Sequence, residues 1–287
     1  MIPVIWHHGV RWLGCTALIN QWYCGPFYQH YETMKDAPRS GDIVVMIIHG
    51  DHERAKGAEI AADLSGFKQA LCIIVGESGE FPVSAVSGPN RWVWQQSPVP
   101  GKHDATKRII LGYPPDAPAL LFMSNILSVQ REYDWFFAGQ VTHSHRYACV
   151  EQLRRMSRGF LLETAGFWQG MERSNYYTAL NRAKIIPCPS GPETPDTFRV
   201  WEALEAGCVP IVDASCPKKD FPTGFWEYVL GKPLPFPVIS DWKTLPDVIQ
   251  EELQKWPANR DALYKWWMNY KRHLLREANM VTQCLTW

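Results

Sequence analysis

Short, continuous runs of apolar residues alternate along the chain with longer segments that have helical periodicity. The strongest run is rich in β-branched residues and occupies residues 42–49. Further strands are expected at 3–6, 71–75, 92–94, 108–111, 135–138, 160–162, 185–186, 209–212 and 234–239, with helices at 53–64, 145–157, 173–182, 197–206, 242–255 and 259–277. Strands that are apolar throughout and are separated by helices are typical of parallel sheets with both faces covered.

A proline-rich segment interrupts this alternation near the middle of the chain. Residues 112–118 contain three prolines, which prevent both a continuous helix and regular strand pairing there. The alternation then restarts, and a length of 287 residues suits two domains. We therefore predict an α/β fold with two Rossmann-like domains that face each other across a central cleft. The N-terminal domain is expected at 1–113, the interdomain segment at 114–132, and the C-terminal domain, ending in helices, at 133–287.

Composition and charge argue against several classes of protein. The 29 Lys+Arg residues balance the 29 Asp+Glu residues, which argues against a broad electrostatic grip on nucleic acid or an anionic membrane. The 8 cysteines have no Cys-x-x-Cys spacing, so we expect unpaired, mostly buried thiols in a reducing compartment. The N-terminus lacks the basic and apolar regions of a signal peptide, and no apolar run approaches the ~20 residues that span a bilayer. We expect a cytoplasmic protein without membrane contact; nothing in the sequence indicates its oligomeric state.

The stretch 183–213 carries the clearest chemistry, because a strand leads through a Pro/Gly loop into a helix. Asp196 or Thr197 can cap that helix, and the free amides at its N-terminus attract a phosphate. Arg199 in the first turn can add a bidentate charged contact. Glu202, one turn later on the same side, can accept two hydrogen bonds from a ribose diol. The alternative is an ordinary capped helix with an Arg–Glu pair on its surface.

The same stretch has a specific sequence pattern. The loop reads PCPSG at 187–191, and the helix and next strand read RVWEALEAGCVPIV at 199–212. Both resemble the signature of exostosin-like glycosyltransferases. Shorter elements fit the same register: FFAG at 136–139 followed by Arg146, LPF at 234–236, ISDW at 239–242, and WW at 266–267 followed by Lys271. The resemblance covers about residues 134–275, and the N-terminal half carries no assignable motif.

The resemblance implies a GT-B-like fold, in which the C-terminal domain binds a nucleotide-sugar donor and the N-terminal domain binds the acceptor. Arg199 would then hold the donor pyrophosphate and Glu202 the nucleoside ribose. Gly139 would allow close backbone approach to the phosphates, and Arg146 would support their charge. With the loop and the helix cap included, the expected donor-binding residues are Gly139, Arg146, Gly191, Thr197, Arg199 and Glu202.

Two further features bear on the reaction. Many retaining GT-B enzymes have another Glu eight positions before the ribose Glu, whereas this chain has Thr194 there and Glu193 beside it, which favours inversion. The chain also lacks an Asp-x-Asp pair, the motif that holds a divalent ion in the other major transferase fold. We therefore expect no metal and no cofactor besides the nucleotide-sugar co-substrate, which we expect to be a UDP-sugar. Amides, a helix dipole and Arg would meet the leaving-group charge.

An inverting transfer needs a base near the acceptor hydroxyl, in the N-terminal half. Asp51, His49 and His52 follow the strongest strand and are the predicted catalytic candidates, with Asp51 first. His7 and Glu77 also follow strands and are further candidates. The alternative is that these side chains only make hydrogen bonds within their loops.

The acceptor is expected to carry a hydroxyl, as on a soluble glycan or a hydroxymethylated DNA base. The basic helix predicted at 145–157 is compatible with a nucleic-acid acceptor. An alternative function is a non-catalytic sugar- or nucleotide-binding protein on the same scaffold, because fold does not fix function. A Rossmann oxidoreductase ranks lower, because the dinucleotide-binding glycine fingerprint is absent.

Overall fold

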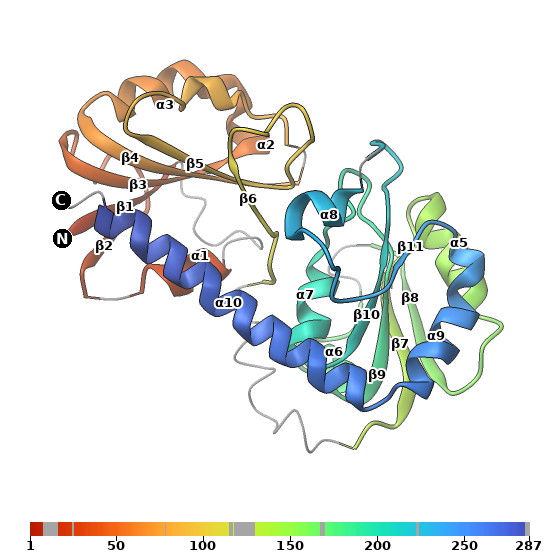
Figure 1. The fold of residues 1–287 in the computed structure, drawn as a ribbon. Coiled ribbons are helices and arrows are strands. Elements are labelled where there is room, and N and C mark those ends of the chain that lie inside the picture. Colours follow the sequence, from red (N-terminus) through yellow and green to blue (C-terminus); the bar gives the residue numbers. More distant parts are fainter. Residues whose placement is uncertain are drawn as a thin grey trace. The chain divides into compact units, whose positions relative to one another are not determined.

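The computed structural model describes residues 1–7, 17–24, 26–77, 79–114, 117, 130–166, 170–221 and 224–284. The chain divides into two compact units (Figure 1): unit 1 holds Met1–Pro115 and Lys271–Trp287, and unit 2 holds Asp116–Tyr270. Each unit contains one sheet of parallel strands, which confirms the predicted α/β fold with two such sheets. Most of the predicted interdomain segment, 114–132, lies outside the described residues, so the predicted domain boundaries stay predictions.

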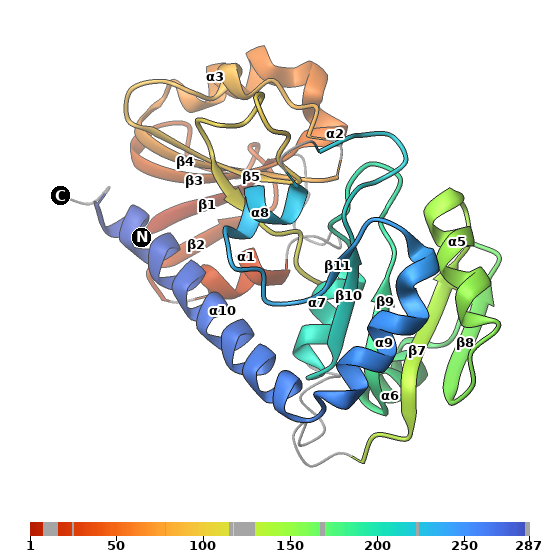
Figure 2. The same cartoon turned by 45° about the vertical axis from the view of Figure 1, so that its right-hand side comes forward.

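Within the described residues, unit 1 has a six-stranded sheet in the order β2-β1-β3-β4-β5-β6, with every neighbouring pair parallel. Its strands are β1 (Ile2–Trp6), β2 (Tyr28–Tyr31), β3 (Gly41–His49), β4 (Phe67–Val75), β5 (Arg91–Gln96) and β6 (Lys107–Ile109). Helices α2 (Gly50–Glu53) and α3 (Gly57–Leu64) lie on one face, and α1 (Ala17–Trp22) lies on the other (Figures 1 and 2).

The apolar strands of unit 1 supply side chains to both faces, because successive side chains on a strand alternate in direction. Val44 and Met46 of β3 pack with Ile60 of α3 on one face. On the other face Trp94 of β5 meets Trp22 of α1, with ring centroids 5.6 Å apart. This double burial explains why β3 and β4 have continuous rather than alternating apolar sequences.

Unit 2 has a five-stranded sheet in the order β11-β10-β9-β7-β8, and its neighbouring strands are also parallel. Its strands are β7 (Tyr133–Gln140), β8 (Gly159–Thr164), β9 (Ala183–Cys188), β10 (Val209–Asp213) and β11 (Val238–Ile239). Helices α6 (Arg173–Asn181) and α7 (Phe198–Glu205) cover one face, and α5 (Ser144–Leu153) and α9 (Leu245–Gln254) cover the other (Figures 1 and 2). Helix α8 (Phe225–Leu230) follows β10, and α10 (Ala258–Cys284) begins in unit 2 and ends in unit 1.

The two sheets share one strand order, in which the first strand of the unit lies between its second and third. In unit 1, β1 lies between β2 and β3, and in unit 2, β7 lies between β8 and β9. The chain reverses its direction across the sheet at these positions. Open α/β sheets bind ligands beyond the carboxyl ends of the strands at such a switch point. The β1/β3 and β7/β9 ends are therefore the places where ligand sites are expected.

The structure differs from the sequence predictions at several elements. Helices α1 and α8 are not among the predicted helices, and two strands differ for identifiable reasons. The apolar pattern does not reveal the edge strand β2, because its sequence YQHY contains no aliphatic run and is only partly buried. The strand predicted at 234–239 shortens to Val238–Ile239, because Pro235 and Pro237 have no N–H to donate to a neighbouring strand.

The protein interior contains many of the tryptophans and cysteines. Fully buried tryptophans include Trp6, Trp135, Trp201, Trp226 and Trp267. In unit 2 the Trp201 ring centroid lies 6.1 Å from that of Trp226 and 5.4 Å from that of Trp267. Of the described cysteine side chains, all unpaired, Cys24 is exposed and Cys72, Cys149, Cys188, Cys208 and Cys216 are buried. The abundant tryptophan thus serves packing in these cases.

Candidate functional site

The carboxyl ends of β7, β9 and β10 lie side by side at the switch point of unit 2. Gly139 lies near the end of β7, Ser190 follows β9, and Asp213 ends β10. Helix α7 starts from the loop after β9, so its N-terminus lies at the same edge. The structure therefore gathers at this edge the predicted donor-binding residues Gly139, Arg146, Gly191, Thr197 and Arg199, with Glu202 one turn further along α7.

The Arg199 side chain reaches from the first turn of α7 back to β7. Its Nη2 donates a hydrogen bond to the Ala138 carbonyl oxygen at 2.8 Å, and its guanidinium carbon lies 4.6 Å from the centroid of the Phe137 ring. Its Nε is buried and has no hydrogen-bond partner among the described residues. An unsatisfied donor on a cation is unfavourable, so this arrangement suits an anionic ligand.

Gly139 provides the space that the guanidinium occupies. A Cβ built on Gly139 would lie 2.4 Å from Arg199 Nη2, which is closer than non-bonded atoms allow. We therefore expect Gly139→Ala to displace Arg199 and to weaken binding of a nucleoside diphosphate about 10- to 100-fold, the equivalent of one charged hydrogen bond. Titration calorimetry measures this loss. Gly41→Ala is the control, because its Cβ would meet only Phe67 ring carbons at 3.6 Å; equal affinities for the two variants would contradict the prediction.

Glu202 is buried, and both of its carboxylate oxygens accept hydrogen bonds from tyrosines. Oε2 accepts from the Tyr176 hydroxyl at 2.9 Å, and Oε1 accepts from the Tyr177 hydroxyl at 2.8 Å. Burial raises the pKa of Glu202, while the two tyrosine hydroxyls act in the opposite direction. Each oxygen keeps a second lone pair that can accept a hydrogen bond from a ribose hydroxyl. The tyrosines thus hold the carboxylate in place, and its contact with a ribose stays a prediction.

Thr197 is the N-cap residue of α7, with φ −133° and ψ 152°, but its hydroxyl makes no capping hydrogen bond. The Thr197 Oγ1 is buried without a partner among the described residues. Asp196 Oδ1 accepts instead from the Trp201 indole nitrogen at 2.5 Å, and the Gly191 amide donates to the Thr194 carbonyl oxygen at 2.9 Å. The Thr197 hydroxyl is thus available to a ligand, whereas the Gly191 amide is used within the loop.

Ser190 connects the loop after β9 to α5. Its carbonyl oxygen accepts from His143 Nε2 at 3.0 Å and from Arg146 Nε at 3.2 Å. Arg146 Nη1 also donates to the Gln140 carbonyl oxygen at 3.2 Å, which fixes this arginine on two strand ends. Because His143 donates through Nε2, its lone pair lies on Nδ1, which is buried and unpartnered in the described structure. Burial, followed by the nearby Arg146 charge, lowers the pKa of His143 to about 4, so the ring is neutral near pH 7.

A second histidine of α5, His145, pairs with the carboxylate that ends β10. His145 Nδ1 lies 2.8 Å from Asp213 Oδ2, and Asp213 is only 1% exposed. The same oxygen accepts from the Trp242 indole nitrogen at 3.1 Å and from the Ser190 backbone N–H at 3.3 Å. An ionised carboxylate only accepts hydrogen bonds, so His145 carries a proton on Nδ1.

These contacts define the chemistry that the edge of unit 2 can perform. Arg199 Nε is an unpartnered donor, Thr197 Oγ1 can donate or accept, and His143 Nδ1 is an unpartnered acceptor. Helix α7 begins at Phe198, and the first amides of a helix attract anionic groups. Together these groups fit a ligand that carries both anionic phosphate oxygens and hydroxyl groups.

The predicted catalytic candidates of unit 1 lie together at the carboxyl end of β3. His49 Nδ1 accepts the His52 backbone N–H at 3.3 Å, so the neutral His49 ring carries its proton on Nε2. Burial, followed by the proximity of His52, lowers the pKa of His49. Asp51 Oδ2 accepts the Glu77 backbone N–H at 2.9 Å and so joins the ends of β3 and β4. The four residues share one sheet edge, where His49 presents a hydrogen-bond donor and Asp51 presents a carboxylate.

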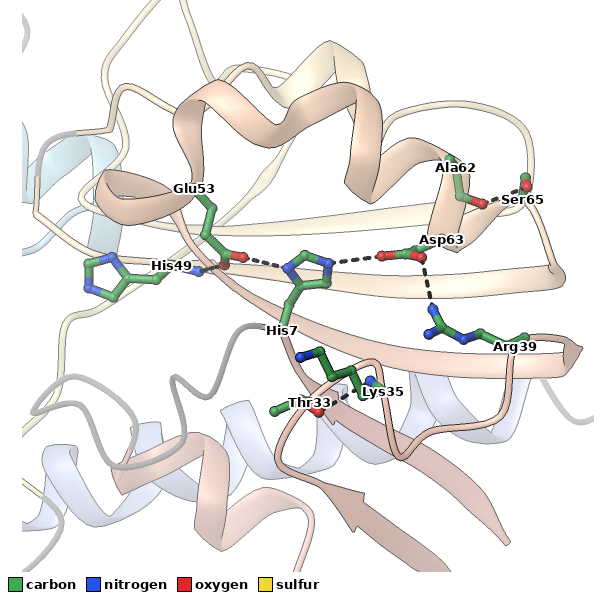
Figure 3. A network of polar contacts seen from close by, with 9 residues as sticks. All are labelled: His7, Thr33, Lys35, Arg39, His49, Glu53, Ala62, Asp63 and Ser65. Carbon is green, nitrogen blue, oxygen red and sulfur yellow. Dashed lines mark hydrogen bonds and ion pairs between the residues drawn. The ribbon is translucent and has the colours of Figure 1, made fainter.

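An ionic network centred on the buried His7 lies beside these residues, at the end of β1 (Figure 3). His7 Nδ1 contacts Glu53 Oε1, and His7 Nε2 lies 3.1 Å from Asp63 Oδ2. Glu53 Oε2 accepts the His49 backbone N–H at 2.7 Å, and Asp63 Oδ1 pairs with Arg39 at 3.4 Å. His7 is fully buried between the two carboxylates. In this position it supports the turn that carries His49.

The sequence does not single out several residues that the structure places at these edges: His143, His145, Tyr176, Tyr177, Asp213 and Glu53. Their partners are distant in the chain, since 68 positions separate His145 from Asp213 and 46 separate His7 from Glu53. Position in the chain is the usable signal, because Asp213 and His145 each follow a predicted apolar strand. Strand ends that are distant in the chain meet at one edge of a parallel sheet.

In the described parts of the chain, no helix combines the length and the apolar content needed to cross a membrane. In the same residues, no three His, Cys, Asp or Glu side chains gather as a metal-ion site requires.

Comparisons with known proteins find relatives for the C-terminal part of the chain. Residues 117–284 match the RXYLT1 C-terminal domain. Ribitol-5-phosphate xylosyltransferase 1 of Homo sapiens is 27% identical over 167 residues, which cover 52% of this chain and 38% of that protein. The Mus musculus protein of the same name is 27% identical over 121 residues, covering 37% of this chain and 27% of its own length. The chain thus spans less than two fifths of these curated relatives. Because the family match covers more than half of the chain and includes the whole strand-end site of unit 2, the chain belongs to the RXYLT1 C-terminal domain family.

Proposed function

We propose that this protein is a glycosyltransferase that moves a sugar from a nucleotide-diphosphate sugar to a hydroxyl acceptor. The observation that carries the proposal is the Arg199 guanidinium, which lies at the switch point of unit 2 with a buried, unpartnered Nε. Thr197 and the first amides of α7 offer further hydrogen bonds to a diphosphate. The relatives' name supports a pentosyl donor, and we propose UDP-xylose.

In the proposed reaction, the bond between the sugar C1 and the diphosphate oxygen breaks, and its electron pair stays on the departing diphosphate. The acceptor hydroxyl oxygen forms the new bond to C1, and its proton passes to a base. Arg199 and the α7 amides stabilise the charge that develops on the diphosphate. Inversion is favoured by Thr194, which stands where many retaining enzymes have a Glu.

We further propose that the reaction needs no metal ion and that the chain has an exostosin-like, GT-B arrangement. The absence of an Asp-x-Asp pair supports the first point, because an arginine and helix amides then have to meet the diphosphate charge. The strand order common to both sheets supports the second, because a GT-B enzyme has two Rossmann-like domains. In this arrangement unit 2 binds the donor, and unit 1 supplies Asp51 as the base on the acceptor side.

The acceptor is proposed to be a glycan or a phosphorylated polyol, with a hydroxymethylated DNA base as the alternative. Ribitol-5-phosphate in the relatives' name supports the polyol. The DNA alternative has less support, because two arginines of the predicted basic helix are paired with glutamates and are less available to a polyanion. Arg154 pairs with Glu163 and Arg155 pairs with Glu151, both at 2.6 Å.

Arg199→Ala tests the proposed function directly. We expect it to lower the transfer rate at limiting donor by about 10²–10³-fold, the range for loss of one charged contact to a transition state. Arg199→Lys should recover only part of the rate, because lysine lacks the planar fork that binds a diphosphate. The assay follows UDP release from UDP-xylose and other nucleotide-sugars, with glycan, ribitol phosphate and hydroxymethyl-DNA acceptors, and identifies products by mass spectrometry.

Arg154→Ala is the matched control, because this arginine is the exposed C-cap residue of α5 and its loss removes only a surface ion pair. Wild-type turnover in Arg199→Ala would contradict the donor-site assignment. Nucleotide-sugar binding without turnover, for every donor and acceptor tested, would favour the alternative of a non-catalytic sugar-binding protein.

A further inference from the structure

We propose that His145 is an additional catalytic residue, which donates a hydrogen bond through Nε2 to the departing diphosphate. The proposal rests on the function proposed above and adds a group that the sequence does not assign. Its basis is the juxtaposition of His145 with the buried Asp213 carboxylate at the edge where Arg199 and the α7 N-terminus lie.

The position of His145 follows from the strand order. It lies in the first turn of α5, which starts after β7, while Asp213 ends β10. Ser190, which follows the intervening strand β9, contacts both: its backbone N–H donates to Asp213 Oδ2 at 3.3 Å, and its Oγ lies 3.5 Å from His145 Nδ1. The imidazole therefore lies across the ends of three neighbouring strands, where a bound diphosphate is proposed.

The orientation of the ring leaves one nitrogen for a ligand. Nδ1 is held 2.8 Å from Asp213 Oδ2, so Nε2 lies on the side of the ring that faces away from this carboxylate. Nε2 has no hydrogen-bond partner among the described residues, and the side chain is 26% exposed. Asp213 does not depend on this histidine alone, because the Trp242 indole and the Ser190 amide also donate to it.

A carboxylate that accepts from Nδ1 has two effects on the opposite nitrogen. It fixes the tautomer and the ring orientation, and its negative charge compensates the positive charge of the doubly protonated ring. When the C1–oxygen bond breaks, the diphosphate oxygen that keeps the electron pair accepts a hydrogen bond from Nε2–H of the doubly protonated ring. No proton leaves the ring, so the ring needs no reprotonation between cycles.

Two substitutions separate this role from a structural one. In His145→Asn the side-chain amide takes the place of Nδ1, so the bond to Asp213 is kept and Nε2 is lost. In His145→Gln the amide reaches toward the Nε2 position, and the bond to Asp213 is lost. We expect the Asn variant to lose about 10²–10³-fold in turnover and the Gln variant to lose less. A structural role for His145 predicts the opposite order.

Binding measurements give a second readout that does not depend on turnover. We expect His145→Asn to bind UDP about 10- to 100-fold more weakly, because one charged hydrogen bond to the terminal phosphate is lost. Affinity for UMP, which lacks that phosphate, should stay unchanged. His273→Gln, which changes an exposed histidine, is the control for all measurements.

The outcomes separate the two proposals. Equal weakening of UDP and UMP, unchanged turnover in His145→Asn, or better turnover in Asn than in Gln overturns the assignment of His145 alone. Failure of wild-type protein to bind UDP or any nucleotide-sugar overturns the proposed function, and the assignment falls with it. Thermal unfolding checks each variant, and if His145→Asn does not fold, the turnover and UDP-to-UMP preference of His145→Gln decide the question.

Discussion

Asp51→Asn is expected to lower the turnover by about 10²–10⁴-fold, the range typical of losing a general base. Asp51 lies at the carboxyl end of β3, and its Oδ2 accepts the Glu77 backbone N–H at 2.9 Å. Asparagine retains an oxygen that can accept this hydrogen bond but cannot take up a proton near neutral pH. The fold and the affinity for UDP should therefore hold while the chemical step fails. Initial rates at saturating donor, together with calorimetry of UDP binding, measure the two effects separately.

The neighbouring histidines provide the alternatives to this assignment. His49 carries its neutral-ring proton on Nε2, because Nδ1 accepts from the His52 backbone, so it presents a donor rather than a base. His52 is exposed, and His52→Gln is the next variant to examine if Asp51→Asn keeps full turnover. Asp42→Asn is the matched control, because Asp42 lies at the opposite end of β3 in an exposed ion pair with Lys68. A loss of turnover in this control would show that the assay reports stability and not chemistry.

Much of the fold could be predicted from the sequence, because parallel strands buried on both faces have continuous apolar sequences. The pattern locates β3, β4, β7 and β10 for this reason. It does not locate β2, whose polar residues lie at a sheet edge. The apolar pattern along the sequence also does not give the strand order, because the order depends on which strands pair in the sheet. The switch points at β1/β3 and β7/β9 therefore came from the structure.

The candidate site likewise contains residues that the sequence predicts and residues that it does not. Arg199 and Thr197 could be predicted, because a loop before a helix, a capping residue and a cation in the first turn are neighbours in the chain. The pairing of His145 with Asp213 could not, because it joins the ends of two strands that are not adjacent in the sequence. The sequence also could not show that Gly139 makes room for the Arg199 guanidinium, since that contact crosses from β7 to α7.

His7→Gln is expected to destabilise unit 1 by about 3–5 kcal/mol, the range for breaking a buried ion pair by removing one partner. The Glu53 carboxylate is 1% exposed and would be left without its cationic neighbour. His273→Gln is the matched control, because it removes a His–Glu pair from the same unit in which the histidine is 61% exposed and 3.2 Å from Glu277. Its expected effect is below about 0.5 kcal/mol. Urea unfolding of the two variants measures the loss of stability in each. Similar losses in the two would contradict a buried charged pair between His7 and Glu53.

The same pair should make the stability of unit 1 fall as the pH rises. Burial alone would lower the pKa of His7, but hydrogen bonds and charges from Glu53 and Asp63 outweigh it and raise the pKa above the ordinary value of 6.5. A raised histidine pKa stabilises the folded state fully below about pH 6.5, and this contribution is lost as the pH rises through the folded-state pKa. His49 acts in the opposite sense, because burial lowers its pKa, so its contribution is lost as the pH falls below about 6.5. The free energy of unfolding of the wild-type protein should therefore decline as the pH rises above about 6.5, whereas His7→Gln should lack that decline. Parallel curves for the two proteins over this range would show that His7 is not protonated in the folded state.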